Sequence, residues 1–538
     1  MRWIHPLSPA VEQTADVLGG KAHGLVVLQR LGLPVPPGFV IGTEACRAFL
    51  RDGRLPDGLD AELATSVAEL EAATHRRFGG RQRPLAVSVR SGGSVSMPGM
   101  MTTILNLGLT AEATTGLAAE TGDTRFALDS RLRFLSSFAT ATADLDTAHL
   151  EAVVEEAAEH HVGDGEARPS RAIRGAETAL EHRADRLVPD DAIEQLKLAV
   201  AAVCSSWDSP RARTYREIHD IPHDRGTAVT VQAMVFGNRD DHSGAGVAFS
   251  RNPNTGAPVP FGDVLFGRQG DDVVSGGVLT RPLHDLADRE PTVWVGLLQA
   301  MDRVEEHERD ACSLEFTFEA GELWLLQVRP GRFVGAAAVR VATDLADAGI
   351  IGRHEALRRV SPQHLRNART PRIAEGAMLA RGVGASPGVA VGRIATTADT
   401  AARMAAAGPV ILVRPETSPR DMHGIAAAAG VVTARGGPAS HAAVVARAMG
   451  KPAVVGIAGL TVADVAVGVG GRTIGAGTHI AIDGTGGDVV LGTPRVTTAT
   501  AGPHLRRLLA WADDVSGDTS ERPETERLSA AHAALGHR

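Results

Sequence analysis

Aromatic residues and cysteines are scarce in this sequence of 538 residues. Aromatic residues make up 4% of the chain, with a single tyrosine, Tyr215, so the sequence shows no platform on which nucleic-acid bases would stack. The three cysteines, Cys46, Cys204 and Cys312, lie far apart in the sequence and fit no metal-binding or disulfide spacing, which indicates a reducing compartment.

The sequence also lacks long apolar runs and an excess of positive charge. It contains no run of 18 apolar residues, and its N-terminus does not resemble a signal peptide. The net charge of −8 argues against a polyanion-binding surface. We therefore expect a cytoplasmic protein with no nucleic-acid or membrane partner. The length suits about three or four domains.

The glycine-rich segment GGKAHG at residues 19–24 does not form a complete P-loop motif. Ala15 stands where the P-loop has its first glycine, and Ala22 stands where it has serine or threonine. Two interpretations of Lys21 stay open on the pattern alone: a phosphate-binding lysine, or a lysine at an ordinary helix start.

A second candidate phosphate site follows the short apolar strand predicted at residues 84–90. The strand ends at Arg90 and leads into a loop rich in glycine and serine. Backbone N–H groups in such a loop can surround phosphate oxygens, and an arginine adds a planar, permanently charged clamp. An ordinary mobile loop explains the pattern equally well.

Residues 314–329 predict a β-hairpin that turns near Gly321. A three-residue loop would place Glu315 opposite Gln327, on one face with Arg329, whereas a two-residue loop would put Glu315 and Gln327 on opposite faces. On the first reading two oxygen ligands lie beside a cation, which suits magnesium next to phosphate. Polar residues on a solvated sheet face are the alternative.

The segment around His441 predicts a strand, a turn and a helix. Residues 430–433 are apolar, Gly436 and Gly437 permit a tight turn, and Ser440 is a candidate N-cap. His441 then lies where unpaired N–H groups and the helix dipole favour a neutral imidazole and an arriving phosphoryl group. Most histidines at helix starts only cap or pack, so the pattern makes His441 a candidate phosphoryl carrier and no more.

Several longer segments resemble the pyruvate, phosphate dikinase and phosphoenolpyruvate synthase family. They are GGKAHG (19–24), LPVPPGF (33–39), SVRSGGSVSMPGMM (88–101), TAVTVQAMVFGN (227–238), GVAFSRNPNTG (246–256), LEFTFEAGELWLLQVRPG (314–331), ETSPRDMHG (416–424) and the stretch 432–456 around His441.

The resemblance implies an α/β fold class, an α+β multidomain chain in the wider sense. We expect an ATP-grasp-like ATP-binding domain at residues 1–340, with a helical insertion at about 111–200. A linker and hinge at 341–380 then lead to a swivelling, β-rich phosphohistidine domain at 381–498. A C-terminal helix and a flexible tail complete the chain at 499–538.

The resemblance also assigns roles to individual residues. His441 matches the phosphorylated, catalytic histidine. The matched ATP ligands are Lys21, Arg90, Gln232, Glu315, Gln327 and Arg329, of which Glu315 and Gln327 also match ligands of Mg²⁺. A phosphate loop comprises Gly99, Met100 and Met101, and the phosphohistidine loop comprises Thr433, Arg435, Gly436, Gly437 and Ser440.

The chain departs from the family pattern at three residues and in length. Ser313 and Thr102 stand where the family usually has aspartates, and Ser313 removes one carboxylate from the nucleotide and metal site. Ala439 replaces the threonine that plant-like dikinases phosphorylate for regulation. The residues after Gly502 are too few for a barrel of about 250 residues, so we expect a chain that lacks the family's C-terminal barrel.

The leading hypothesis is a phosphotransferase that uses Mg-ATP to phosphorylate His441. AMP and phosphate or pyrophosphate would leave, and the phosphoryl group would pass to pyruvate on a separate barrel protein or to another small molecule. Two alternatives stay open: a small-molecule or antibiotic phosphotransferase, and a non-catalytic, nucleotide-binding regulatory homologue. The sequence does not fix the oligomeric state, and a homodimer is one possibility.

Overall fold

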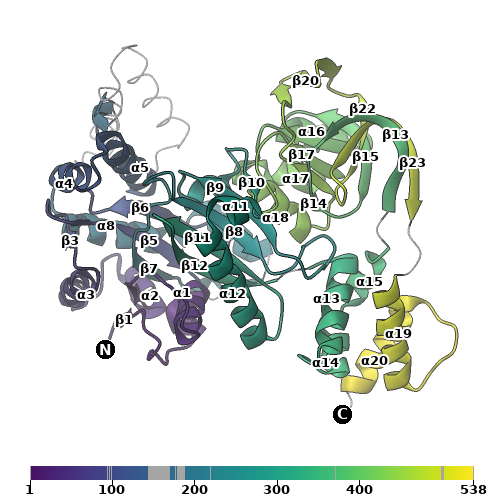
Figure 1. Ribbon diagram of the computed structural model, residues 1–538, viewed down its shortest axis with the longest axis horizontal. Helices are drawn as coiled ribbons and strands as arrows, with labels where there is room; N and C mark the ends of the chain where they lie inside the picture. The colour runs from purple at the N-terminus through teal and green to yellow at the C-terminus, as the bar shows by residue number, and fades with distance from the viewer. Residues whose placement is uncertain are drawn as a thin grey trace. The chain divides into compact units, whose positions relative to one another are not determined.

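The computed structural model describes residues 2–536 with gaps at 94, 96, 98–99, 143–169, 172, 176, 179–187, 219, 332, 370 and 499–501. The chain divides into two compact units, which are described separately (Figure 1). The first unit comprises Met1–Arg239 and Trp324–Gln327, and the second comprises Asp240–Leu323 and Val328–Arg538. Both units combine helices with sheets, so the mixed α/β fold class is confirmed.

The first unit is built on a five-stranded sheet with the order β1-β2-β7-β5-β6. The sheet forms because its strands are apolar runs, for example Val229 and Val231 of β7 and Val87 and Val89 of β5, which are all fully buried. The strands of this unit are β1 (Ile4–Pro6), β2 (Gly38–Ile41), β3 (Arg77–Phe78), β4 (Pro84–Leu85), β5 (Val87–Gly92), β6 (Thr103–Leu107) and β7 (Ala228–Ala233).

Helices pack against this sheet and share one hydrophobic core with it. The helix α8 illustrates the pattern, because Leu196, Val200 and Val203 recur at helical spacing and are all buried. The helices are α1 (Ala15–Arg30), α2 (Thr43–Asp52), α3 (Leu59–Thr74), α4 (Ala111–Thr121), α5 (Thr124–Thr142), α8 (Ala192–Ser206), α9 (Pro210–Ile218) and the 3₁₀ turn η1 (His223–Arg225).

The helical character predicted for residues 111–200 is confirmed where the structure describes this segment. The helices α4 and α5 occupy its beginning, and α8 starts near its end. Residues 143–169 of this segment lie outside the described residues.

The second unit begins with another five-stranded sheet, of order β10-β9-β8-β11-β12. The strands β11 and β12 form the predicted hairpin, and Ala320 and Gly321 between them both have positive φ. The elements are β8 (Gly244–Phe249), β9 (Phe261–Phe266), β10 (Arg281–Pro282), β11 (Cys312–Glu319), β12 (Glu322–Pro330), α10 (Gly270–Ser275), α11 (Asp285–Arg289) and α12 (Pro291–Glu308).

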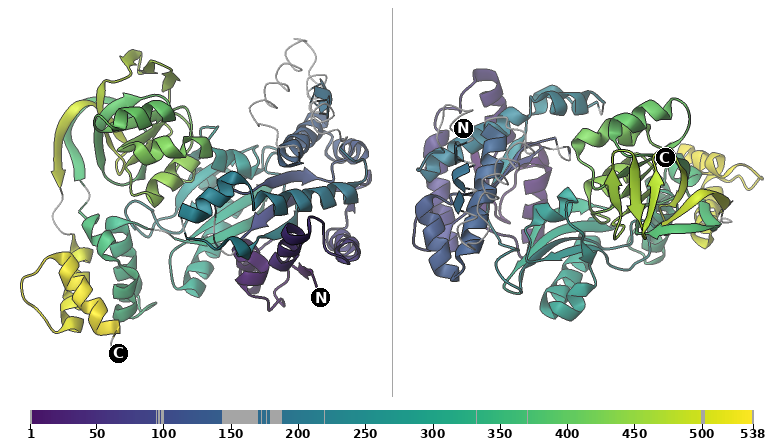
Figure 2. Two further views of the ribbon diagram at one scale, coloured as in Figure 1. Left: turned by 180° about the vertical axis from the view of Figure 1, so that it is seen from behind. Right: turned by 90° about the horizontal axis from the view of Figure 1, so that it is seen from above.

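An eight-stranded sheet follows, with the order β13-β23-β22-β15-β16-β17-β18-β14. At its centre β15, β16, β17 and β18 run parallel, and the remaining neighbours are antiparallel. Figure 2 shows β13 and β23 as a long curved pair at one side of this sheet. The strands are β13 (Pro371–Arg381), β14 (Val383–Ser386), β15 (Val389–Ala395), β16 (Val410–Arg414), β17 (Gly430–Thr433), β18 (Ala453–Val455), β22 (His479–Asp483) and β23 (Asp488–Thr498).

Short elements complete this domain. Alanines of α18 pack with Val431 and Val455 in one core cluster of the sheet. The helices are α16 (Ala398–Ala405), α17 (Met422–Ala427), α18 (His441–Ala448) and the 3₁₀ turn η2 (Pro419–Asp421), and a separate small sheet contains β19 (Thr461–Ala463), β20 (Ala466–Val469) and β21 (Arg472–Gly475).

The linker and the tail differ from the expectations for them. Residues 371–380, which we expected to belong to the linker and hinge, form the edge strand β13. Residues 524–536, predicted as a flexible tail, form helix α20 (Glu524–Gly536), because Leu528, Ala531 and Leu535 recur at helical spacing and are buried. Together with α13 (Gly335–Asp347), α14 (Arg353–Arg359), α15 (Pro362–Arg366) and α19 (Pro503–Ser516), α20 forms a helical bundle with its own core.

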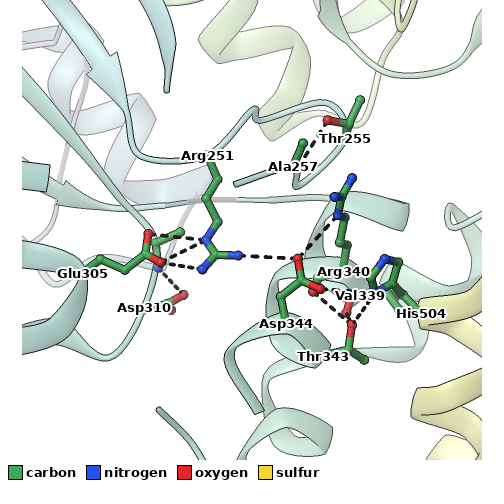
Figure 3. Close-up of polar contacts among 11 residues, drawn as sticks. Arg251, Thr255, Ala257, Glu305, Asp310, Val339, Arg340, Thr343, Asp344 and His504 are labelled. Carbon is green, nitrogen blue, oxygen red and sulfur yellow. Dashed lines mark hydrogen bonds and ion pairs between the residues drawn. The ribbon is translucent and has the colours of Figure 1, made fainter. Parts of the chain in front are cut away.

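A buried arginine connects this bundle to the second sheet. Arg251, which follows β8, makes a two-nitrogen contact with Glu305 of α12, and its Nη1 lies 3.6 Å from Oδ2 of Asp344 in α13 (Figure 3). His504 of α19 also reaches Asp344, with its Nδ1 3.3 Å from Oδ1. Arg251, at the end of β8, and His504, in α19, therefore both contact Asp344 of the bundle helix α13.

None of the helices in the described part of the chain combines the length and the apolar run that a bilayer crossing requires.

Candidate functional site

In the first unit, the start of α1 packs directly on the end of β5. Gly19 has φ 73°, and a Cβ atom there would lie 1.7 Å from Gly92 O, so only glycine permits the contact. The Gly20 N–H donates to Gly93 O over 3.0 Å. The GGKAHG segment therefore lies within α1, around a kink at Gly19, rather than in a loop before a helix. This packing brings Lys21 beside the strand that carries Arg90, as a Cβ on Gly92 would lie 3.5 Å from Cβ of Lys21.

The neighbouring strand β7 contributes Thr230 and Gln232. Thr230 pairs with Arg90, and its buried hydroxyl has no hydrogen-bond partner among the described residues. An unpaired buried hydroxyl beside an arginine fits an oxygen-rich ligand such as a phosphate chain. Gln232 is fully buried and donates from Nε2 to Pro36 O over 3.0 Å, which fixes its side chain inside the sheet.

The loop after β5 is anchored by its methionines. Met100 is buried in a cluster with Trp207 and Ile221, and Met101 packs against the same cluster. These two side chains hold the loop to the helical layer, so any phosphate contact there would come from the backbone. Gly99 lies outside the described residues.

In the second unit, Glu315 of β11 and Arg329 of β12 form an ion pair of 2.7 Å. The turn contains two residues, yet Arg329 lies on the face of Glu315. A two-residue turn alone would not place Gly331 opposite Ala311. The Gly331 N–H nevertheless donates to Ala311 O, so the register between the two strands shifts by one residue along the hairpin. Gln327 lies in the first unit and is buried.

Magnesium would find few protein ligands here. Within the described ranges, no group of three or more His, Cys, Asp or Glu side chains could hold a metal ion. Ser313, two residues before Glu315 on the same strand, supplies only a hydroxyl. The arrangement fits a magnesium ion that takes one carboxylate, Glu315, and obtains its other ligands from phosphates and water.

His441 is the first residue of α18, as predicted. Its Nδ1 lies 3.2 Å from Oγ1 of Thr417. Burial lowers the pKa of the His441 imidazole, and the nearby carboxylate of Asp421 opposes that shift. A neutral ring that donates Nδ1–H to Thr417 leaves the lone pair of Nε2 unshared. Thr417 lies within the ETSPRDMHG segment, but no local pattern there distinguishes it from its neighbours.

Ser440 occupies the N-cap position, but its side chain makes no capping hydrogen bond. Its buried hydroxyl has no hydrogen-bond partner among the described residues, one position before His441. Further contacts hold the phosphohistidine loop: Thr433 Oγ1 donates to Arg435 O over 2.7 Å, and Arg435 pairs with Glu416 at 2.6 Å.

The buried carboxylate of Asp263 on β9 contacts the phosphohistidine loop. Its Oδ2 accepts the Ala439 N–H over 3.0 Å, and its Oδ1 accepts the Thr280 hydroxyl over 2.9 Å. A Cβ on Gly437 would lie 2.0 Å from Oδ1, so the contact requires glycine there. Burial raises the pKa of Asp263 to about 6, although these hydrogen bonds and the positive charge of Arg447 oppose the shift.

These features define a class of protein: an ATP-grasp-type lobe followed by a β-rich domain in which a neutral histidine begins a helix. The sequence comparisons identify the family. Residues 15–76 and 55–282 match the AMP/ATP-binding domain of pyruvate phosphate dikinase, and residues 406–487 match the mobile domain of PEP-utilising enzymes. The chain belongs to the pyruvate, phosphate dikinase family, which confirms the resemblance stated from the motifs.

Relatives in plants and bacteria are similar over nearly the whole chain. Pyruvate, phosphate dikinase 2 of Zea mays is 40% identical over 514 residues, which are 93% of this chain and 58% of that protein. Pyruvate, phosphate dikinases of Clostridium symbiosum and Rhizobium meliloti are 38% and 39% identical, over 95% and 96% of this chain and 60% of each relative. The chain thus spans less than two thirds of the length of these relatives.

The raised pKa of Asp263 predicts a specific pH dependence of stability. Because the folded-state pKa of about 6 exceeds the ordinary value of 3.8, protonated Asp263 stabilises the fold at low pH, and this contribution is lost as the pH rises from about 4 to about 6. The shift corresponds to roughly 3 kcal/mol. Asp263→Asn keeps the size and an acceptor oxygen but has no charge to desolvate. We expect the melting temperature of the wild type, relative to this variant, to fall across that window. A difference that stays constant from pH 4 to pH 7 would contradict the assignment.

Proposed function

We propose that the chain transfers a phosphoryl group from Mg-ATP to Nε2 of His441. The observation that carries this proposal is the state of the His441 ring: it is neutral, begins a helix, and is occupied at Nδ1 by Thr417. A neutral imidazole with a free Nε2 lone pair is a nucleophile for phosphorus. The unpaired N–H groups at the start of α18 and the Ser440 hydroxyl would receive the phosphoryl oxygens.

The donor site of the proposal consists of the predicted ATP ligands. In the first unit Lys21 and Arg90 would neutralise phosphate charge, and Gln232 and Gln327 would shape the nucleotide pocket. In the second unit Arg329 would contact phosphate, and Glu315 would bind magnesium, which supplies charge neutralisation when bound. Glu315 must then leave its ion pair with Arg329 to accept the metal.

The chemistry follows the dikinase pattern. Nε2 of His441 forms a bond to the β-phosphorus of ATP, the bond from that phosphorus to the α–β bridging oxygen breaks, and AMP leaves. The γ-phosphoryl group passes to inorganic phosphate or to water. Movement of the β-rich domain would then carry phosphohistidine to an acceptor bound outside residues 1–538. Because the relatives are named for pyruvate, we propose pyruvate or another small molecule as that acceptor.

A second candidate function is nucleotide binding without turnover. Ser313 supplies no carboxylate, and Glu315 already forms an ion pair with Arg329. Such a protein would bind ATP and leave His441 unmodified.

Labelling with ATP that carries isotope in the β-phosphate distinguishes the two functions. We expect an acid-labile, base-stable label on the protein that is lost in His441→Ala. His423→Ala is the matched control, because His423 lies in α17 of the same domain and pairs with Asp399 at 2.8 Å; it should label normally. AMP should appear in step with the label, with pyrophosphate only when phosphate is supplied. ATP binding without label would overturn the proposal in favour of the second candidate.

The contact between Thr417 and His441 makes a separate prediction. Thr417→Val keeps the shape but removes the partner of Nδ1, whereas Thr417→Ser keeps the hydroxyl. Because one neutral hydrogen bond contributes about 1 kcal/mol, we expect phosphorylation of His441 to slow by roughly five- to tenfold in Thr417→Val. Single-turnover labelling measures this rate. Equal rates in the valine and serine variants would show that the hydroxyl does not orient the ring.

A further inference from the structure

The segment that follows β16 runs beside the phosphohistidine loop that follows β17. The two strands are parallel neighbours, and hydrogen bonds between the segments continue beyond their ends. The Ala434 N–H donates to Arg414 O over 3.1 Å. The Arg435 N–H then donates to Pro415 O over 2.9 Å. These bonds fix the two segments side by side, so Thr417, two residues further on, reaches the candidate histidine.

A buried carboxylate closes the turn that carries Thr417. Asp421 is 7% exposed, and its Oδ2 accepts the Ser418 N–H over 2.9 Å and the Ser418 hydroxyl over 3.1 Å. The Ser418 hydroxyl also accepts the Arg420 N–H over 3.3 Å, and Ser418 and Asp421 form a capping box around the short turn η2. Asp421 therefore holds the backbone at the residue next to Thr417.

Arg414 connects the other oxygen of this carboxylate to the sheet. Its Nε lies 3.3 Å from Oδ1 of Asp421, and its Nη1 donates to Thr396 O over 3.0 Å. Arg414 is the last residue of β16, a strand inside the eight-stranded sheet. The Asp421 carboxylate is thus held from two sides, by its own turn and by the end of a central strand.

The negative charge of Asp421 acts on the His441 ring. Burial lowers the pKa of the imidazole, and the attraction from Asp421 opposes that shift. The other charged side chains of the two segments are Glu416 and Arg435, which pair with each other at 2.6 Å, and Arg420, which is exposed. A positive charge on the buried ring is therefore stabilised by the Asp421 carboxylate.

Transfer of a phosphoryl group makes this attraction relevant, because the ring becomes positively charged. When Nε2 of His441 bonds to phosphorus and Nδ1 keeps its proton, the ring carries the charge of a protonated imidazole. The carboxylate that favours protonation of the ring then also favours bond formation at Nε2. A negative charge that is already fixed in place does so without reorganisation during the reaction.

We propose that Asp421 is a positioning residue for the transfer to His441: it holds Thr417 against Nδ1 and stabilises the positive charge that the ring acquires. This inference rests on the proposed function, because it concerns the same transfer. Nε2 forms a bond to the β-phosphorus, the bond from that phosphorus to the α–β bridging oxygen breaks, and its electron pair leaves with AMP. The proton on Nδ1 stays on the ring and is donated to Thr417 Oγ1.

Titration of the His441 ring tests the charge of Asp421 without ATP. In the full chain with ¹⁵N-labelled histidine, NMR follows both ring nitrogens against pH, and the signals lost in His441→Ala identify them. Asp421→Asn keeps an acceptor oxygen for Ser418 but removes the charge, so the pKa of His441 should fall while the proton of the neutral ring stays on Nδ1. An unchanged pKa of His441 in this variant would overturn the proposal.

Asp399→Asn is the matched control for the titration. Asp399 is an exposed carboxylate of the same domain, and it contacts His423 at 2.8 Å. Its removal should leave the titration of His441 unchanged, because Asp399 takes no part in the turn that carries Thr417. A fall of the His441 pKa as large as that in Asp421→Asn would show a general charge effect and overturn the proposal.

Single-turnover labelling, with isotope in the β-phosphate of ATP, tests the positioning. We expect phosphorylation to slow roughly threefold in Asp421→Asn, which removes the charge. In Asp421→Ala, which also releases Thr417, it should slow by roughly a further five- to tenfold. Thr417→Val should slow Asp421→Asn as it slows the wild type, but it should add little in Asp421→Ala, because residues that act as a unit are not additive. A full effect of Thr417→Val in Asp421→Ala would overturn the proposal.

The two measurements separate this inference from the proposed function. A wild type that binds ATP and takes no label would overturn the proposed function, and the titration would still decide the role of Asp421 at the ring. If Asp421→Ala does not fold, Asp421→Asn decides the kinetic test: a rate equal to that of the wild type would overturn the proposal.

Discussion

A neutral imidazole at a helix start is the feature on which the proposed chemistry depends. His441 can accept a phosphoryl group only if its ring is uncharged and one nitrogen is free. Burial favours the first condition by lowering the pKa of the ring. The contact of Nδ1 with Thr417 meets the second condition in the tautomer in which Nδ1–H donates, because Nε2 then keeps its lone pair. The backbone supplies a third element, because α18 begins at His441 and directs its unpaired N–H groups to where phosphate oxygens would arrive.

Near neutral pH, the buried carboxylate of Asp263 that contacts the phosphohistidine loop lowers the stability of the fold. Burial disfavours the ionised form of the Asp263 carboxylate and so raises its pKa to about 6. The loop accommodates the Asp263 carboxylate because Gly437 has no side chain there and the Ala439 N–H donates a hydrogen bond to Oδ2. A contact of this kind holds the loop less tightly at neutral pH than at low pH, which would suit the domain movement that we propose.

Much of the fold could be predicted from local sequence, and the reasons are physical. Strands such as β16 and β17 are short apolar runs near glycine or proline, so their positions could be predicted, whereas their parallel pairing is shown only by the structure. The fold class and the family were also predictable. Helix α20 was missed because its buried face contains just two large apolar residues, Leu528 and Leu535, together with Ala531.

The site was predictable only where function is carried by a motif. The place of His441 at the start of a helix was predicted correctly, and its catalytic role stays a prediction. The residues that contact it and its loop were not predicted, because they come from other segments. Thr417 lies 24 residues away and Asp263 lies 176 residues from its partner Ala439. The hydrogen bonds of Gln232 and the packing of Met100 likewise depend on tertiary contacts that no local pattern encodes. The roles of Lys21, Arg90, Glu315 and Gln327 in binding ATP stay predictions.

The position of the phosphoryl group on the imidazole ring tests the central claim most directly. After incubation with Mg-ATP, protein with ¹⁵N-labelled histidine can be studied by ³¹P and ¹H–¹⁵N NMR at alkaline pH, where phosphohistidine is stable. We expect one phosphohistidine, bonded through Nε2 of His441, because Thr417 contacts Nδ1. Phosphate on Nδ1, on another residue, or on no residue while ATP is bound would contradict it.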